Sequence, residues 1–270
     1  MGLARGLVGA LLLLVLVVDG AAADRLADIK ARGTIIVGVS TAIPPFTFLR
    51  EGAIRGYDVD LVQGIAQRIG VKAVLVPVGE SMRVKAVQAG MIDLIASTFT
   101  RTPERERAVA FSLDIFNSPQ VMIVDKASGL TSVKQMTGGR TFGVLQGRTS
   151  DQNIREVVPD AKFIYLADYV SAFDGLRMNT FIAFAADNLV LRTNLIKEKD
   201  AGRFHFIADF SKARNAGFGM PKDEPALKAA VDQALRAMEK SGEAARIYDV
   251  WFGANSPVPI ERALIIGAGP

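Results

Sequence analysis

The 270-residue chain has no cysteine and a single histidine, His205. Without cysteine it can form neither a disulfide nor a thiolate nucleophile. One histidine excludes a histidine pair as a metal site and leaves a Ser–His–Asp triad with one candidate base. Residues 203–206 read as a strand, so we expect His205 to be structural or surface-exposed. The sequence therefore predicts no catalytic residue, no metal site and no cofactor.

Aromatic residues make up only 7% of the chain, and the basic residues are scattered rather than clustered. Nucleic-acid binding typically needs a basic stripe with stacking aromatics, so no nucleic-acid partner is expected. Half of the residues are hydrophobic, which allows sizeable cores and argues against disorder. The modest net charge of +4 suits anionic or zwitterionic solutes.

One long apolar run is present, from Gly6 to Val18. Arg5 precedes it, and the small residues Ala21-Ala22-Ala23 follow, as in a secretory signal peptide cleaved before Asp24. The run is too short to span a bilayer comfortably, although an uncleaved anchor is the alternative. No cysteine follows it, so a lipoprotein anchor is not expected. We predict that residues 1–23 are a signal peptide and that the protein is exported.

Short apolar runs alternate with amphipathic segments in the mature chain. Strands are expected at 34–39, 72–78 and 92–97, with helices at 57–69 and 82–89. After Phe111 the order starts again, with strands at 121–124, 141–145, 163–166 and 181–185, helices at 149–157 and 171–178, and a mostly helical tail at 225–251. This alternation predicts an α/β fold with parallel strands and helices on both faces. Two lobes accommodate the elements more naturally than one sheet.

Residues 97–105 place a row of hydroxyl side chains just before a helix start. Thr102 suits the N-cap, Pro103 the first helical position and Glu104 the first turn. The free N–H groups of a helix N-terminus attract anions, and Arg105 could clamp a carboxylate with two parallel hydrogen bonds. The segment favours a carboxylate receptor, with an edge strand and an ordinary cap as the alternative.

Several short motifs occur in a shared order along nearly the whole mature chain. They are Leu26–Thr34, Pro44-Pro45-Phe46, Gly56–Leu61, Thr102–Arg105, Phe111-Ser112, Val144–Gly147, Ala186-Asp187-Asn188 and Val250–Gly253. Each motif is weak alone, but their order and spacing make the match specific. On these motifs the chain resembles solute-binding proteins of the polar amino-acid type (extracellular solute-binding protein family 3), the receptor components of ATP-driven (ABC) importers.

The resemblance implies a two-lobed clamshell fold, in which each lobe is a mixed, mostly parallel sheet with flanking helices. Lobe 1 would combine residues 24–115 with 217–270, and lobe 2 would be 120–211. The hinge would lie near 116–119 and 212–216, and two crossings would restrict motion to opening and closing. The resemblance also implies a periplasmic monomer that binds a small-molecule amino acid and presents it to a cognate ABC permease in the inner membrane.

The resemblance assigns roles to five residues. Arg105 would pair with the ligand α-carboxylate, to which Thr100 would donate its hydroxyl and backbone N–H. Thr149 would supply another N–H at a helix N-terminus. Thr98, through its carbonyl, and Asp187 would receive the α-ammonium. The alternatives are a solvated first-turn charge for Arg105 and an ordinary helix cap for Asp187.

Departures from the family pattern fall on the side-chain pocket. Ile43 and Glu80 stand at or near positions where relatives often carry aromatics, and Ser40 stands where receptors for cationic amino acids commonly have Asp. Arg83 falls where relatives that bind acidic or amide amino acids often have Arg, and Arg148 adds a second cation. Acidic or amide amino acids are therefore the first choice of ligand. Alternatively, Arg83 neutralises Glu80, three residues earlier on the same helix.

Two other functions are compatible with the same fold. An exported enzyme similar to cyclohexadienyl or arogenate dehydratases would keep Arg105 for a carboxylate and need an acid near the leaving hydroxyl, for which Glu80 is a candidate. A sensory ligand-binding module is disfavoured, because the chain ends after the last helix without a membrane or signalling segment. We expect a binding protein rather than an enzyme.

Overall fold

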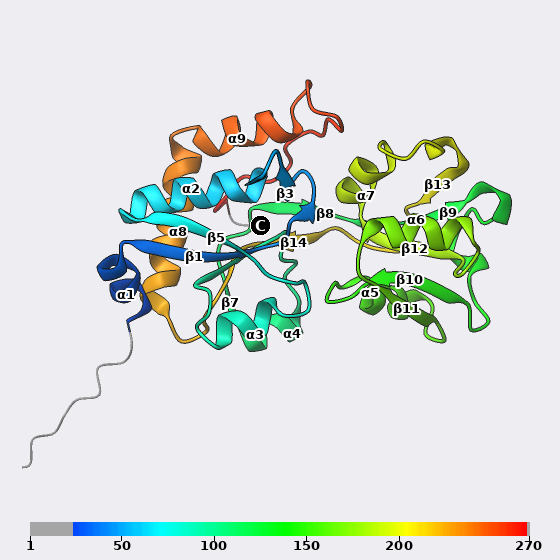
Figure 1. Cartoon of the computed structure of the whole chain (residues 1–270), viewed down its shortest axis with the longest axis horizontal. Coiled ribbons are helices and arrows are strands. Elements are labelled where there is room, and N and C mark those ends of the chain that lie inside the picture. The colour runs from blue at the N-terminus through cyan, green and yellow to red at the C-terminus, as the bar shows by residue number, and fades with distance from the viewer. Residues whose placement is uncertain (1–23, 269–270) are drawn as a thin grey trace, which may run out of the picture.

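The computed structural model describes residues 24–268, so the predicted signal peptide at 1–23 lies outside the described residues. The chain forms two α/β lobes side by side, joined by extended segments (Figure 1). The predicted two-lobed fold class is confirmed. Within residues 24–268, no helix has both the length and the apolar character needed to cross a bilayer.

The first lobe is built on a five-stranded sheet in the order β5-β1-β6-β15-β7. Its strands are β1 (Thr34–Val39), β5 (Lys72–Pro77), β6 (Leu94–Ala96), β7 (Ala110–Phe111) and β15 (Gly219–Met220). β1 pairs in parallel with β5 and β6, whereas β15 pairs antiparallel with β6 and β7. The helices are α1 (Arg25–Arg32), α2 (Tyr57–Ile69), α3 (Arg83–Gln88), α4 (Pro103–Ala108), α8 (Pro225–Lys240) and α9 (Glu243–Phe252). Helices α2 and α9 lie on one side of the sheet and α3 and α4 on the other (Figure 1).

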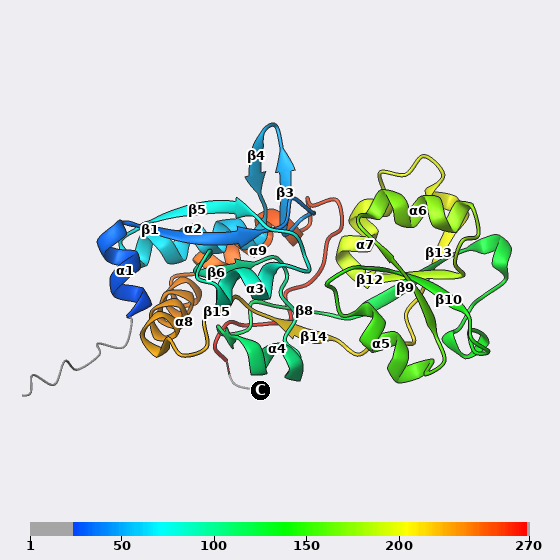
Figure 2. The same ribbon diagram turned by 60° about the horizontal axis from the view of Figure 1, so that its bottom comes forward.

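The second lobe is built on a sheet in the order β11-β10-β12-β9-β13. Its strands are β9 (Gln120–Asp125), β10 (Thr141–Leu145), β11 (Lys162–Leu166), β12 (Ala183–Asp187) and β13 (Phe204–Ile207). β10 pairs in parallel with β11 and β12, and β9 pairs antiparallel with β12 and β13. Helices α6 (Tyr169–Arg177) and α7 (Asn188–Leu195) cover one face, and α5 (Ser150–Val157) covers the other (Figure 2). Short 3₁₀ turns are η1 (Lys126–Ser128), η2 (Val133–Gln135) and η3 (Ala201–Arg203).

The structure corrects two expectations drawn from local pattern. The sheets are mixed rather than parallel throughout, because β9 runs antiparallel to β12 and β13, and β15 runs antiparallel to β6 and β7. The strand expected at 181–185 runs from Ala183 to Asp187 instead, because the Phe181 ring packs against Gly143 and Gly175. The small sheet of β2 (Ala42–Ile43), β3 (Thr47–Arg50) and β4 (Ala53–Arg55), which projects from the first lobe, was not predicted (Figure 2).

The chain leaves the first sheet through β8 (Phe116–Ser118) and returns through β14 (Arg214–Ala216). These two strands pair antiparallel and run side by side between the lobes (Figure 1). The side chains of Asn117 and Asn215 are hydrogen-bonded to each other, and Asn215 also donates to Asp114 Oδ2 at 2.6 Å. The crossing is therefore a paired ribbon rather than two independent linkers.

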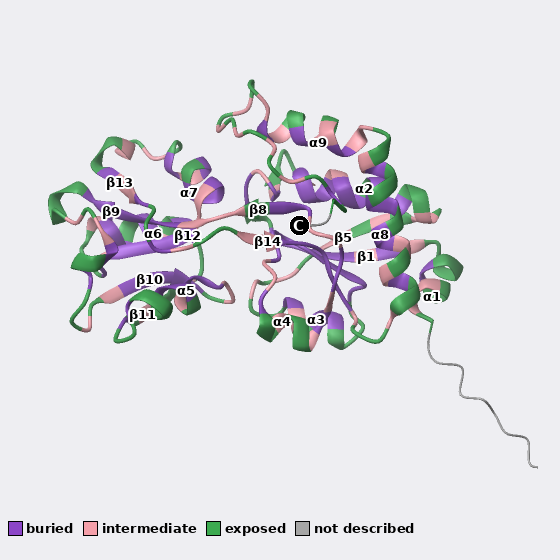
Figure 3. Cartoon of the chain, turned by 180° about the vertical axis from the view of Figure 1, so that it is seen from behind, coloured by how far each residue is buried: buried purple, intermediate pink, exposed green. Residues whose placement is uncertain are grey.

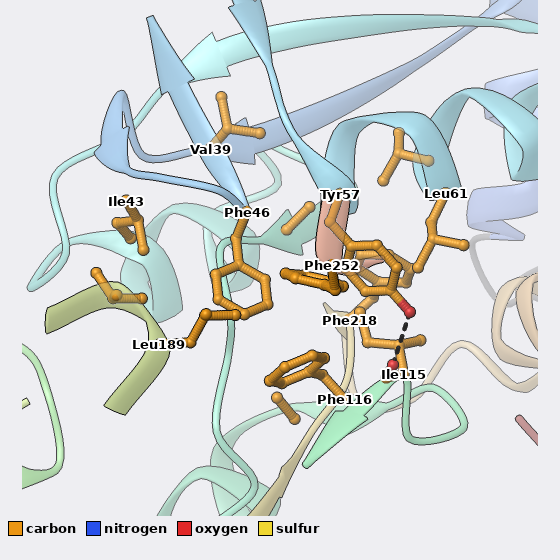
Figure 4. Close-up of a cluster of buried hydrophobic side chains, with 14 of the residues drawn as sticks. Val39, Ile43, Phe46, Tyr57, Leu61, Ile115, Phe116, Leu189, Phe218 and Phe252 are labelled. Carbon is orange, nitrogen blue, oxygen red and sulfur yellow. Dashed lines mark hydrogen bonds between the residues drawn. The ribbon is translucent and has the colours of Figure 1, made fainter. Parts of the chain in front are cut away.

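Buried residues follow the strands of both sheets (Figure 3) and extend across the crossing. In the first lobe, Phe46 stands edge-on to Phe116, with ring centroids 4.8 Å apart, and the Tyr57 hydroxyl donates to the Ile115 carbonyl at 2.9 Å. Leu189 of α7, in the second lobe, belongs to the same hydrophobic cluster and lies beside Phe46 (Figure 4). Apolar packing therefore fixes the point where the chain leaves the first lobe.

Candidate functional site

A cavity of ≈ 30 Å³ lies between the lobes, next to β8 and β14. Six of the nine residues predicted from the sequence line it: Thr98, Thr100, Arg105, Arg148, Thr149 and Asp187. The first three come from the first lobe and the others from the second. Polar side chains that line it as well include Ser118, Gln120, Ser150, Asn153, Tyr169, Lys212 and Arg214. The lining combines polar and apolar side chains, and it carries more cations than carboxylates.

Arg105 is held at the start of α4. The Thr102 hydroxyl accepts from the Arg105 backbone N–H at 3.2 Å, as predicted for an N-cap. The guanidinium lies 4.4 Å from the centre of the Phe99 ring and donates to the carbonyls of Thr100 at 2.9 Å and Gly147 at 3.0 Å. Burial lowers the pKa of Arg105 to about 9, and Arg83 and Arg148 act in the same direction, so the group remains charged at neutral pH. Within residues 24–268, Arg105 forms no ion pair, which suits it to an incoming anion.

The N-terminus of α5 lines the same cavity from the second lobe. Thr149 occupies the N-cap position without a side-chain cap bond, and its hydroxyl accepts from Gln120 Nε2 at 3.0 Å. Gln120 Oε1 accepts in turn from Asn153 Nδ2 at 2.8 Å. In the described part of the chain, Ser150 Oγ and Asn153 Oδ1 are buried without a partner. Because unpaired buried polar groups are costly, this arrangement points to a polar ligand.

Asp187 caps a helix and also lines the cavity. It caps α7, where its Oδ1 accepts from the N–H groups of Leu189 at 3.0 Å and Val190 at 3.3 Å. It also lines the cavity. Burial raises the pKa of Asp187 above its ordinary value, although hydrogen bonds, including the two cap bonds, and Arg148 oppose the shift. A cationic group in the cavity would favour its ionised form.

Buried Arg83 and the partly buried Glu80 and Arg148 form a charge cluster beside the cavity. Glu80 Oε2 lies 2.7 Å from Arg83 Nη2 and 2.9 Å from Arg148 Nε. Arg83, only 1% exposed, also donates to the Ser97 carbonyl at 3.0 Å. Burial opposes ionisation of Glu80, but Arg148 and Arg83 outweigh it and hold the pKa of Glu80 below its usual range. Arg83 therefore neutralises Glu80, and neither residue lines the cavity.

Ile43, the remaining predicted pocket residue, lies in the hydrophobic cluster with Phe46 (Figure 4). It is 1% exposed and does not line the cavity. Asp58, in contrast, was not predicted as a site residue, yet its Oδ2 accepts from the Thr98 backbone N–H at 2.7 Å. Its place in the motif Gly56–Leu61 was the available signal. No sequence signal pointed to Gln120 and Asn153, because these two residues become neighbours only in the folded chain.

The family model of bacterial extracellular solute-binding proteins, family 3, matches residues 35–254. The chain is 31% identical over 234 residues to the ABC transporter glutamine-binding protein GlnH of Bacillus subtilis (strain 168), covering 85% of each chain. Among solved structures, an ancestral arginine-binding protein bound to glutamine is 31% identical, with a TM-score of 0.75 over 82% of this chain and 99% of that one. An ancestral amino acid-binding protein, a precursor of cyclohexadienyl dehydratase, is 30% identical, with a TM-score of 0.74 over 84% of this chain and 98% of that one.

Proposed function

Because the chain belongs to the bacterial extracellular solute-binding proteins, family 3, we propose that it binds an L-amino acid between its lobes and delivers it to the permease of an ABC importer. The observation that carries the proposal is the cavity to which both lobes contribute charged and hydroxyl side chains. Arg105 and Thr100 line it from one lobe, and Thr149 and Asp187 line it from the other. The relatives named for glutamine binding support an amino acid as the ligand.

A zwitterion needs donors at one end and a carboxylate at the other. Arg105, Thr100 and the uncapped N-terminus of α5 supply donors for an α-carboxylate. Asp187 and Thr98 supply the receptor for an α-ammonium. We propose an acidic or amide side chain for the ligand, because Lys212 and Arg214 also line the cavity while Asp187 is its one carboxylate among the described lining residues.

Binding requires the lobes to move. A cavity of ≈ 30 Å³ has room for about one or two waters, so an amino acid enters only when the lobes separate. We propose that β8 and β14, within the segments 116–119 and 212–216, are the hinge. Residues 24–115 with 217–270 would then move as one lobe, and 120–211 as the other.

Membership of the family supports a location outside the cytoplasmic membrane. We propose that residues 1–23 direct export, that the mature protein works in the periplasm as a monomer, and that its partner is the cognate permease in the inner membrane. Size-exclusion chromatography with light scattering tests the monomer, and N-terminal sequencing of the periplasmic protein tests cleavage before Asp24.

The ligand can be identified by a thermal-shift screen of the mature protein against the common amino acids and small carboxylates, followed by calorimetry. A ligand at about 100 times its dissociation constant adds roughly 2.7 kcal/mol of stability. We expect L-glutamine or L-glutamate to give the largest shift. If no amino acid changes the unfolding temperature, the proposal is wrong.

Binding is also better supported than catalysis on this fold. A dehydratase would need an acid beside the leaving hydroxyl, and Glu80 was the candidate. Arg148 and Arg83 hold Glu80 ionised at neutral pH, so it has no proton to give. We therefore expect no turnover of prephenate or arogenate, and measurable turnover would favour the enzyme instead.

A further inference from the structure

Asp58, in the first turn of α2, is a buried carboxylate next to the site. The residue is 1% exposed. Its Oδ2 accepts from the Thr98 N–H at 2.7 Å, and its Oδ1 is buried without a hydrogen-bond partner among the described residues. A buried carboxylate with one free oxygen is expensive. Helix initiation alone therefore does not explain why a carboxylate is buried at position 58.

Thr98, the residue that Asp58 holds, has an unusual conformation. Its φ of +44° lies in the left-handed region, which β-branched residues rarely adopt. Thr98 is 6% exposed and lines the cavity, and its hydroxyl is buried without a partner in the described part of the chain. The surroundings must hold such a conformation in place. The short bond from the Thr98 N–H to Asp58 is the contact that does so.

The charges around Asp58 are nearly balanced. Arg83 of α3 and Arg148 of the loop before α5 both act on it, while Tyr57 precedes it on α2. Those two arginines already share Glu80. Burial raises the pKa of Asp58 to about 7, against the opposing effects of the Thr98 N–H, Arg148 and Arg83. The pKa of Asp58 therefore lies near neutral pH, and one more positive charge nearby favours its ionised form.

We propose that Asp58 is a positioning residue for the ammonium end of the ligand. It fixes Thr98 in the conformation that presents this residue to the cavity, and its negative charge lies directly behind Thr98. The inference rests on the proposed function, because it requires a ligand with an ammonium group. The ammonium end would then have two carboxylates. Asp187 would contact the ammonium directly, whereas Asp58 would act on it through Thr98.

A proton-linked affinity follows from this arrangement. An ammonium near Thr98 favours the ionised form of Asp58 and so lowers the pKa of Asp58 in the complex. Binding near pH 7 then releases a proton, and affinity rises with pH until Asp58 is ionised in the free protein. Affinity is thus full above about pH 8 and falls as the pH drops below 7. Asp187, whose pKa burial also raises, contributes in the same direction.

The test compares wild type with Asp58→Asn, which keeps an acceptor for the Thr98 N–H but removes the charge. The matched control is Asp60→Asn on the same turn, where Asp60 Oδ2 accepts from Trp251 Nε1 at 2.7 Å and does not line the cavity. L-Glutamine and L-glutamate are titrated calorimetrically from about pH 5.5 to 8.5, in two buffers of different ionisation enthalpy. Thermal unfolding checks that each variant is folded.

We expect Asp58→Asn to weaken both probes at least tenfold at the highest pH, and to release fewer protons on binding near pH 7 than wild type. Asp60→Asn should match wild type in both respects, and the pH dependence left in Asp58→Asn would belong to Asp187. Affinity within about threefold of wild type, or an unchanged proton release, would overturn the role of Asp58 alone. Failure of the wild type to bind any amino acid would instead overturn the proposed function, and this inference with it.

Discussion

Arg105 is the cation on which ligand binding should depend most. Its guanidinium is half-buried against Phe99, and its hydrogen bonds go to two carbonyls rather than to a carboxylate. Arg105→Ala should lower amino-acid affinity by 100-fold or more and leave the fold intact, because removing one partner of a buried charge pair costs roughly 2–5 kcal/mol. Calorimetry measures the loss. Arg107→Ala, an exposed arginine on the same helix, should bind normally, and comparable affinities in the two variants would contradict the assignment.

Asp187 can be tested separately because its two roles respond differently to one change. Asp187→Asn keeps the cap of α7, since Asn caps helices about as well as Asp, but it removes the charge that, by the proposed function, would face the ligand ammonium. We expect a strong loss for L-glutamine and a much smaller one for glutaramate, which lacks the α-ammonium. The comparable cap variant Asp168→Asn, on α6, should alter neither. Equal losses for both ligands, measured by calorimetry, would make Asp187 purely structural.

Residues that belong to a local sequence pattern were the easiest to predict. Thr102, Pro103 and Arg105 form a local pattern that requires no tertiary information, and the structure shows the predicted cap. Arg83 was ambiguous, because a cation beside a cleft can face a ligand or a neighbouring carboxylate; only the folded positions of Glu80 and Ser97 decide. Ile43 shows the same limit for an apolar residue, which fills a core as readily as a pocket.

At the level of elements, long periodic segments were predicted best. The bounds of β1, α2 and β10 agree with expectation, since each is a sustained apolar pattern, and α2 ends at Gly70 with φ +85°. The direction of each strand was harder to predict from the sequence, because it depends on which strands become neighbours in the folded sheet. The hairpin strands β3 and β4 were missed because they are short and half-exposed.

The loop between β10 and α5 is the element that joins the lobes most closely. Gly147 has φ +77°, and a Cβ there would lie 2.5 Å from the backbone nitrogen of Ser81 and 2.6 Å from the carbonyl carbon of Glu80. Its carbonyl accepts from Arg105, and its neighbour Arg148 pairs with Glu80. Backbone therefore meets backbone across the cleft at this position, with no room for a side chain.

Gly147→Ala should prevent full closure. Gly129→Ala is the matched control, because Gly129 has φ +67° and nothing within 4 Å of an added Cβ. Both variants should lose roughly 1 kcal/mol of stability through strain in the left-handed region. Only Gly147→Ala should also lose ligand affinity, by tenfold or more, because its Cβ keeps the lobes apart. Thermal unfolding and calorimetry separate the two effects, and equal affinities would show that this contact does not govern closure.

For the whole molecule, the described conformation is a closed one. Glu80–Arg148, Arg105 with Gly147, and Gln152 Nε2 donating to Glu104 Oε2 at 2.7 Å all link the two lobes. The clamshell class was predictable from motif order along the chain. The degree of closure was not, because it depends on a balance between these few polar contacts and the freedom of the paired strands β8 and β14.

Ligand should shift that balance toward closure, and solution scattering can follow it. Donors on one lobe and Asp187 on the other are bridged by one ligand only when the lobes meet, so the closed form has the higher affinity and its population rises on binding. We expect a smaller radius of gyration at saturation with an amino acid whose binding calorimetry has established. Arg105→Ala should lose this change together with binding, whereas Arg107→Ala should keep it. An unchanged wild-type profile would mean either that the cleft is already closed without ligand or that the site is confined to one lobe, and Arg105→Ala separates the two, since a site that spans both lobes should lose the ligand-induced change along with binding. If saturating ligand bound Arg105→Ala without moving the lobes, a clamshell mechanism would not apply to this protein.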